Sequence, residues 1–294
     1  MATAEKHQKS LGSTAKAIGL ELLAILLFTL FMLPFAFVLI NSMRTNGEII
    51  NRAVGWPQDA ANLFANIVLV WNNPTFSFLA AFRDSVIITA LSLLIICLVS
   101  SMAAWILVRN KTGWSSAFFL MFITAMVIPF QVVMFPLVSW FRTIGEATHI
   151  PLLRTYGGIV FAYLGFGESM SVFIFHGFIK NIPLELEEAA EIDGCNRAEI
   201  FFRIVFPLLQ PVVVTVLVLN GLWIWNDYLL PLLILGANGS VRTIPLAVQG
   251  FIGSYVKQWH LIMVSTLLAM LPIIILYIFA QKYIVKGMVD GAGK

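Results

Sequence analysis

Charged residues, cysteine and the usual catalytic motifs are scarce in this sequence. Only 11% of its 294 residues are charged, against about 25% in an ordinary soluble domain. The two cysteines, Cys97 and Cys195, show no metal-ligand spacing, and a disulfide between them is not indicated. The sequence has no His-Glu-x-x-His pair, no Gly-x-Ser-x-Gly elbow and no Gly-x-x-x-x-Gly-Lys-Ser/Thr loop. These absences argue against a zinc protease, a serine hydrolase and a nucleotide site of the chain's own, so we expect no covalent chemistry from it.

Long apolar runs dominate what is present. Hydrophobic residues make up 60% of the chain, and runs of about 20 residues can each cross an apolar layer of roughly 30 Å as a helix. We predict six such helices, at Leu20–Ile40, Ser85–Val108, Ala117–Trp140, Ile159–Ile179, Leu208–Leu235 and Leu261–Ala280. The predicted fold class is therefore an all-α integral membrane protein. The first run is too long for the core of a cleaved signal peptide, and we expect it to be retained.

Lysine and arginine are distributed unevenly between the predicted loops. If the N-terminus lies inside, eleven of the 18 lysines and arginines fall on the inner side and seven on the outer side. Because positive residues favour the cytoplasmic side, both termini are predicted to be cytoplasmic. The predicted organisation is a tail at residues 1–19, a six-helix membrane domain at 20–283 and a second tail at 284–294.

Two sizeable loops are then expected outside. The first, from Asn41 to Arg83, is rich in turn residues and is long enough to fold over the outer mouth of the domain. The second, Gly236–Trp259, contains Gly253 and Tyr255 among several glycines and polar residues. Its composition fits a functional loop and an ordinary solvent loop equally well.

A short acidic segment separates the fourth and fifth apolar runs. Four glutamates and Asp193 lie between positions 185 and 193. Within them Leu186, Ala189 and Ala190 form a narrow apolar stripe at i, i+3 and i+4. This pattern indicates a water-exposed helix that binds a soluble protein, and the alternative is a solvated acidic loop.

Asp227 is interpreted as the one ionisable residue well inside a predicted span. It lies about 28 Å along a helix that begins at Leu208, towards the outer surface. In one interpretation it belongs to an interfacial aromatic belt with neighbouring tryptophans and Tyr228. In the other, Asn220, Trp223 and Asp227 form one stripe at i, i+3 and i+7, in which an aromatic face beside amide and carboxylate groups suits a sugar.

The strongest motif overlaps the acidic segment. Glu188-Ala189-Ala190 is followed after three residues by Gly194, and after nine more by Ile204, one residue, and Phe206-Pro207. This spacing resembles the EAA motif of permease subunits of bacterial binding-protein-dependent ABC importers, with phenylalanine in place of the family's leucine. Further stretches are similar to the carbohydrate branch, specifically the second permease subunit of maltose-type transporters: Asn41–Arg44, Trp225–Tyr228 with Pro231, Thr243–Leu246, and Gln281–Gly287.

The resemblance implies a type I importer permease of six transmembrane helices with a cytoplasmic coupling helix, here residues 183–207. It implies that these residues bind the partner ATPase: Glu188, Ala189, Ala190, Asp193, Gly194, Ile204 and Pro207. Gly194 is expected to adopt a positive φ at the end of that helix. The implied pathway residues are Asn220, Trp223 and Asp227.

The resemblance also implies the partners and the location. Those partners are an ATPase dimer, a second homologous permease, an extracytoplasmic sugar-binding protein and the sugar itself, in the bacterial cytoplasmic membrane. No cofactor is expected on this chain, because ATP and Mg²⁺ would bind the ATPase. Two alternatives remain open: a secondary transporter driven by an ion gradient, which leaves the acidic helix unexplained, and a membrane scaffold that anchors an ATPase without transport.

Overall fold

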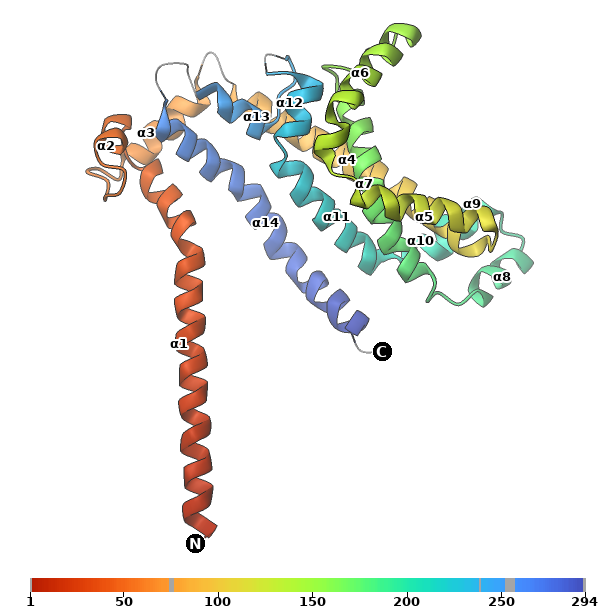
Figure 1. The fold of residues 1–294 in the computed structure, drawn as a ribbon, viewed down its shortest axis with the longest axis horizontal. Helices are drawn as coiled ribbons and strands as arrows, with labels where there is room; N and C mark the ends of the chain where they lie inside the picture. The colour runs from red at the N-terminus through yellow and green to blue at the C-terminus, as the bar shows by residue number, and fades with distance from the viewer. Residues whose placement is uncertain (1, 74–76, 238, 252–256, 293–294) are drawn as a thin grey trace. The chain divides into compact units, whose positions relative to one another are not determined.

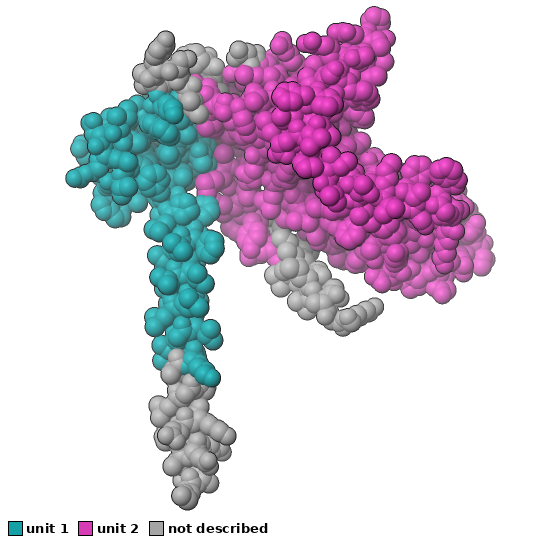
Figure 2. Space-filling model, in the orientation of Figure 1, with its two compact units in different colours: residues 1–72, 251–268 teal, residues 73–250, 269–294 magenta. Residues whose placement is uncertain are grey.

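The computed structural model describes residues 2–73, 77–237, 239–251 and 257–292, and it is built from helices joined by short connections (Figure 1). The chain divides into two compact units (Figure 2). The first unit contains Met1–Asn72 and Phe251–Leu268, and the second contains Asn73–Gly250 and Ala269–Lys294.

The first unit begins with a long helix and continues through the predicted first outer loop. It contains α1 (Ala2–Ser42), α2 (Asn46–Asn51), α3 (Asn62–Trp71) and the first part of α14 (Trp259–Ala292). Thr45 and Glu48 form a capping box at the start of α2, which satisfies two backbone donors that have no partner within the helix. The backbone N–H groups of Thr45 and Gln58 donate to the Glu48 carboxylate and lower its pKa from the ordinary value.

Arg44 organises this loop from the inside. Its guanidinium is buried and donates to Asn41 Oδ1 at 2.8 Å and to the backbone oxygens of Glu48 and Arg52, both at 2.6 Å. Asn66 on α3 donates to the backbone oxygens of Ser42 and Arg44. The segment that was predicted as a turn-rich loop is thus two short helices fixed to the end of α1.

The second unit carries most of the long helices and the acidic segment. In chain order it contains α4 (Phe78–Arg109), α5 (Gly113–Val127), α6 (Phe130–Thr148), α7 (Tyr156–Ile179), α8 (Glu185–Ile192), α9 (Arg197–Ile200), the π-helix η1 (Phe201–Val205), α10 (Phe206–Leu208), α11 (Gln210–Asn226), α12 (Leu229–Leu235), α13 (Ile244–Val248) and the start of η2 (Gln249–Phe251). Helices α4 and α7 pack along one another and form its centre. One apolar cluster surrounds Tyr163 and Ile88, and a second surrounds Phe175 and Phe201 near the acidic segment.

Three helices are long and apolar enough to cross a membrane. They lie at Lys16–Ser42, Phe78–Arg109 and Tyr156–Ile179, and they contain the predicted first, second and fourth runs. Two bent helix pairs, at Gly113–Thr148 and Arg197–Asn226, raise the number to five if each is one span. The described part of α14 is apolar over Trp259–Ile275, which is shorter than the other spans. The chain is a multi-pass membrane protein. Its described residues contain three to five candidate spans, whereas six were predicted.

Two predictions of a continuous helix are wrong. The run Ala117–Trp140 is broken between α5 and α6, which meet at a bend of 107°. Pro129 causes this break, because the residue before a proline is pushed out of the helical conformation, and Ile128 is extended with φ −73° and ψ 117°. The run Leu208–Leu235 is broken after α11, since Pro231 has no N–H to donate to the carbonyl of Asp227, four residues earlier.

Candidate functional site

The acidic segment folds as a helix, a turn and a second short helix. Glu185, Glu187 and Glu188 occupy the first turn of α8, where the positive end of the helix dipole favours carboxylates. The helix ends at Ile192, and Gly194 follows its C-cap residue Asp193 with φ +85°, which confirms the expected left-handed turn. Cys195 N–H then donates to the carbonyl of Ala190 at 3.0 Å and closes the end of the helix. The helix predicted in the acidic segment is therefore present.

The second half of the segment returns the chain to the membrane domain. Asn196 and Glu199 form a capping box at the start of α9. The π-helix η1 follows, a geometry that is rare in proteins and frequent at functional sites. Ile204 packs against the neighbouring apolar cluster, whereas Pro207 is exposed.

Glu187 attaches the acidic helix to the end of α4. Its Oε1 accepts from Arg109 Nε at 2.8 Å and from Arg109 Nη2 at 2.6 Å, while its Oε2 accepts from Trp105 Nε1 at 2.9 Å. Arg109 also donates to the backbone oxygen of Ile182, just before α8. The Glu187 side chain is only 8% exposed, so this carboxylate is a buried anchor. All four glutamates were predicted from the sequence to be solvated. The one sequence feature that pointed to a buried Glu187 was its spacing of three residues from Ala190.

The predicted apolar stripe of this helix is divided between two faces. Ala190 is 6% exposed and packs into the chain's own core beside Glu187. Leu186 is 45% exposed and Ile192 is 87% exposed, with Ala189 exposed between them. The stripe of Leu186, Ala189 and Ala190 is thus corrected: the free apolar residues are Leu186, Ala189 and Ile192. Glu188, Asp193 and Gly194 are also exposed.

Asp227 lies at the break between α11 and α12. Its Oδ2 accepts from the hydroxyl of Tyr163 on α7 at 3.1 Å, and its Oδ1 accepts from the backbone N–H of Leu229 at 3.0 Å. The ring of Trp223 meets that of Tyr163 edge to face, with 5.4 Å between ring centroids. Asp227 and Trp223 are therefore joined through Tyr163, a residue that the sequence did not single out.

Asn220 does not share an accessible face with these two residues. It is fully buried, and its Nδ2 donates to Ser171 Oγ and to the backbone oxygen of Val216, both at 3.0 Å. Its Oδ1 has no hydrogen-bond partner among the described residues. A Cβ added at Gly167 would lie 2.9 Å from this oxygen. The expected stripe of Asn220, Trp223 and Asp227 is therefore corrected, because Asn220 packs between α11 and α7.

Trp223 borders a cleft of about 400 Å³ beside the break between α5 and α6. The opposite walls come from the residues around Pro129 and from α7. The lining residues are Ala125, Met126, Ile128, Phe130, Val133, Gly165, Phe166, Ser169, Met170 and Trp223. The recess beside the helix break thus combines aromatic faces with a serine hydroxyl.

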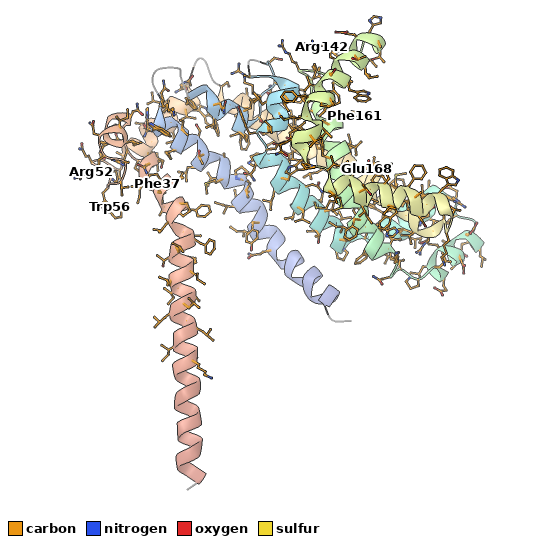
Figure 3. The ribbon with its side chains drawn as sticks, viewed as in Figure 1. Phe37, Arg52, Trp56, Arg142, Phe161 and Glu168 are labelled. Atoms are coloured by element: carbon orange, nitrogen blue, oxygen red, sulfur yellow. The ribbon has the colours of Figure 1, made fainter. Side chains whose placement is uncertain are left out.

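Glu168 is a second carboxylate inside the apolar helices, and the sequence reading missed it. It lies near the middle of α7 (Figure 3), one residue before Ser169 of the cleft. It is half-buried, and no hydrogen bond or ion pair is found for it within the described ranges. The interpretation of Asp227 as the one ionisable residue in a span is therefore wrong. Glu168 could have been found from the sequence, because it falls inside the predicted run Ile159–Ile179.

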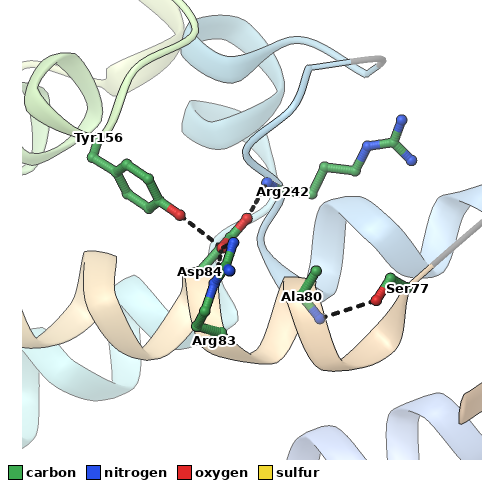
Figure 4. Close-up of polar contacts among 6 residues, drawn as sticks. All are labelled: Ser77, Ala80, Arg83, Asp84, Tyr156 and Arg242. Atoms are coloured by element: carbon green, nitrogen blue, oxygen red, sulfur yellow. Dashed lines mark hydrogen bonds and ion pairs between the residues drawn. The ribbon is translucent and has the colours of Figure 1, made fainter.

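A buried aspartate holds part of the predicted second outer loop. Asp84 accepts from the hydroxyl of Tyr156 at 2.7 Å, from the Arg83 guanidinium at 2.9 Å and from the backbone N–H of Arg242 at 3.1 Å (Figure 4). Next to it, Ser85 Oγ accepts from the backbone N–H of Ile244 at 2.8 Å. The segment from Arg242 onwards is thus held against α4 and continues as α13. Gly253 and Tyr255 of the predicted loop lie outside the described residues, which exclude 238 and 252–256.

The sequence is similar to those of known transport proteins. Residues 96–290 match the family described as the binding-protein-dependent transport system inner membrane component. The chain is 42% identical over 275 residues to the starch degradation products transport system permease protein AmyC of Thermoanaerobacterium thermosulfurigenes, covering 94% of this chain and 96% of that protein. It is 33% identical over 276 residues to the melibiose/raffinose/stachyose import permease protein MelC of Bacillus subtilis, with the same coverage.

A solved structure shares the fold. A chain of a bacterial ABC transporter involved in the import of the acidic polysaccharide alginate superimposes with a TM-score of 0.72 at 19% identity. The match covers 88% of this chain and 94% of that chain. The family model spans well over half of the sequence, and the resemblance first found at the EAA spacing is confirmed. This chain belongs to the family of inner membrane components, or permease subunits, of binding-protein-dependent transport systems.

Proposed function

We propose that this chain is a permease subunit of an ABC importer that takes up a sugar or oligosaccharide by alternating access. Two permeases that resemble it along 94% of its length are named for starch degradation products and for melibiose, raffinose and stachyose. The chain covers 96% of each of those proteins, so the proposal concerns the whole subunit and not a shared fragment.

The observation that carries the proposal is the attachment of the acidic helix through Glu187 and Arg109. An ATPase that moves a permease must act on a part that is rigidly joined to the membrane helices. The bidentate contact between Glu187 and Arg109, with Trp105 on the second oxygen, joins α8 to the end of α4. We propose that residues 183–207 are the coupling helix region and that movement of α8 is passed to α4.

The surface that α8 leaves free suits a partner protein. Leu186, Ala189 and Ile192 supply apolar contacts, and the exposed carboxylate of Glu188 supplies a charge for a basic residue of the ATPase. Asp193 and Gly194 lie at the exposed end of the helix. In this proposal Ala190, Ile204 and Pro207 act mainly by shaping the segment, and Ala190 does so from the chain's own core.

The substrate pathway is proposed to run past the cleft beside the helix break. Trp223 offers an aromatic face to the apolar C–H side of a sugar ring, and Ser169 offers a hydroxyl. Asp227 holds Tyr163 against Trp223 and so fixes the angle of that face. Glu168, beside the cleft on α7, is proposed as a hydrogen-bond acceptor for sugar hydroxyls, because unpaired carboxylates inside membrane helices mark substrate paths.

The partner subunits and the membrane topology are proposed from the family. The partners are an ATPase dimer that binds ATP and Mg²⁺, a second homologous permease and an extracytoplasmic sugar-binding protein. This chain would contribute six spans with both termini in the cytoplasm of a bacterial cell, and would perform no hydrolysis itself. The second outer loop, anchored at Asp84 and Ser85, would face the binding protein.

The test is reconstitution of the chain with its neighbouring ATPase, sister permease and sugar-binding protein in liposomes. We expect ATPase activity to rise when the binding protein is loaded with a maltodextrin or raffinose-type oligosaccharide, and radiolabelled sugar to accumulate only with ATP. Uptake that collapses with an ionophore and ignores ATP would establish the secondary transporter instead. An ATPase that binds but neither responds to sugar nor moves it would establish the scaffold.

A further inference from the structure

A basic cleft lies on the second unit at the ends of α4 and α7. Its volume is about 1070 Å³, and the end of α4, the short connection to α5, the first turns of α5 and the end of α7 form its walls. The lining residues are Leu107, Val108, Arg109, Asn110, Lys111, Thr112, Gly113, Ser115, Ser116, Phe119, Leu120, Ile123, His176 and Lys180. None of these lining residues is an aspartate or glutamate.

The charge in this cleft is not neutralised within the described chain. Lys111 and Lys180 are exposed, and neither takes part in an ion pair between described residues. Arg109 is different, because its guanidinium is held by Glu187 and by the carbonyl of Ile182. Two exposed ammonium groups without an ion-pair partner among the described residues therefore line the recess, while the guanidinium of Arg109 holds α8 in place.

The hydrogen-bonding groups of the cleft are mostly donors. Helix α5 begins here, and Thr112 caps it by accepting from the backbone N–H of Ser115. The earlier N–H groups of a first helical turn have no partner inside the helix and attract anions. The hydroxyls of Ser115 and Ser116 line the same wall.

His176 supplies the independent sign that a ligand belongs in this cleft. It is only 7% exposed and stacks on Phe119 with 3.6 Å between ring centroids. No hydrogen-bond partner is found for its ring among the residues that the structure describes, although it lines the cleft. Because the ring lines the cleft, this imidazole can donate a hydrogen bond to a group that enters it.

We propose that this cleft binds a phosphate group, with Lys111 and Lys180 as its counter-charges and His176 as a buried hydrogen-bond donor. The chemistry fits a phosphate ester because the walls offer cations and donors without a competing carboxylate. Basic recesses between transmembrane helices at a membrane surface are suited to anionic lipid headgroups. A phosphatidylglycerol headgroup is one source of that phosphate, and free inorganic phosphate is the other. The proposal does not rest on the transported substrate.

The experiment uses the purified transporter, with the subunits that accompany this chain, in nanodiscs that contain a photoactivatable phosphatidylglycerol or the matching phosphatidylcholine. Labelled peptides are read by mass spectrometry. We expect phosphatidylglycerol to label the peptides around Lys111 and Lys180 and to exceed phosphatidylcholine there. The double variant Lys111→Ala/Lys180→Ala should lower this labelling about 25-fold, since each lysine near an anionic lipid contributes a factor of about five.

Two control variants distinguish binding at this cleft from a general effect of positive charge and from an effect on folding. Lys16→Ala/Arg142→Ala removes two exposed cations elsewhere and should leave the labelling of these peptides unchanged. His176→Phe keeps an aromatic ring for the stack on Phe119 but removes the donor, and it should lower the labelling with normal co-purification of the partner subunits.

The two sources of phosphate give different results in one further arm. If a lipid is the ligand, excess inorganic phosphate leaves the labelling intact; if free phosphate is the ligand, it competes and protects the same peptides. Both results support a phosphate site. Equal labelling by the two lipids without competition from phosphate would overturn the proposal, as would wild-type labelling in the double lysine variant.

Discussion

Glu187 and Asp227 are both carboxylates held against a neighbouring helix, but they are satisfied in different ways. Glu187 accepts two hydrogen bonds from a cation, Arg109, and one from Trp105. Asp227 accepts only from neutral donors, the Tyr163 hydroxyl and a backbone N–H. A buried charge pair that loses one partner leaves an uncompensated charge behind, whereas a neutral donor that loses its acceptor does not. The acidic segment therefore depends on its anchor for stability, and the region around Asp227 uses its carboxylate to set geometry.

The largest effect is expected from Glu187→Ala, which leaves the Arg109 guanidinium without its carboxylate. We expect a loss of about 3 kcal/mol, the lower end of the range for breaking a buried ion pair, because Arg109 is partly exposed. The purified subunit should melt at a lower temperature, and ATPase co-purification should fall with it.

Glu188→Ala is the matched control one residue away. Its carboxylate is exposed, so thermal stability should change by no more than about 0.5 kcal/mol, while binding to the ATPase weakens. Equal melting temperatures for the two variants would show that the contact with Arg109 does not anchor α8.

The next effect concerns the turn that ends the helix. Gly194→Val places a β-branched side chain at φ +85°, a conformation that costs about 2 kcal/mol for such a residue. We expect α8 to shift, ATPase co-purification to drop and membrane insertion to remain normal. Gly177→Val is the control, because that glycine lies within α7 and no atom lies within 4 Å of an added Cβ. A Gly194→Val transporter with full ATPase yield and uptake would remove the proposed docking role.

Asp227→Ala should reduce sugar uptake without loss of assembly. Removing this carboxylate frees Tyr163 and lets the ring of Trp223 reorient. A hydrogen bond to a charged group contributes about 1.5–3 kcal/mol, so uptake should fall roughly tenfold or more. The measurement is initial uptake by proteoliposomes with basal ATPase activity as the internal reference, and Asn226→Ala is the neighbouring control. Unchanged uptake would return Asp227 to the interpretation of an interfacial aromatic belt.

The smallest effect is expected from Glu168→Gln, which keeps the shape of the side chain and removes only its charge. Hydrogen bonds to a charged acceptor are roughly twice as strong as neutral ones, and the loss of that difference should raise KM for uptake about fivefold. A matched experiment compares two oligosaccharides, since a residue that contacts sugar hydroxyls changes preference between them. A variant with wild-type KM for both would place Glu168 outside the pathway.

Local features were predictable from the sequence because their causes are local. The length of the apolar runs indicated α1, α4 and α7, and Gly194 ended α8 in the left-handed turn that a glycine permits. The EAA spacing identified the family from a few residues. The breaks at Pro129 and Pro231 had local causes too, and were missed because apolar composition was given more weight than the missing N–H and the restricted conformation before a proline.

Only the tertiary structure decided which faces of these helices are buried. The sequence placed Ala190 with the exposed stripe and Asn220 with the pathway, yet both pack into the chain's own core. The reason is that helical periodicity fixes which residues share a face but not the rotation of the helix against its neighbours. That rotation depends on distant partners, Arg109 for α8 and Ser171 for α11, which lie 78 and 49 residues away along the chain. Composition and motifs determined the class of protein and its family, and contacts between remote segments determined its site.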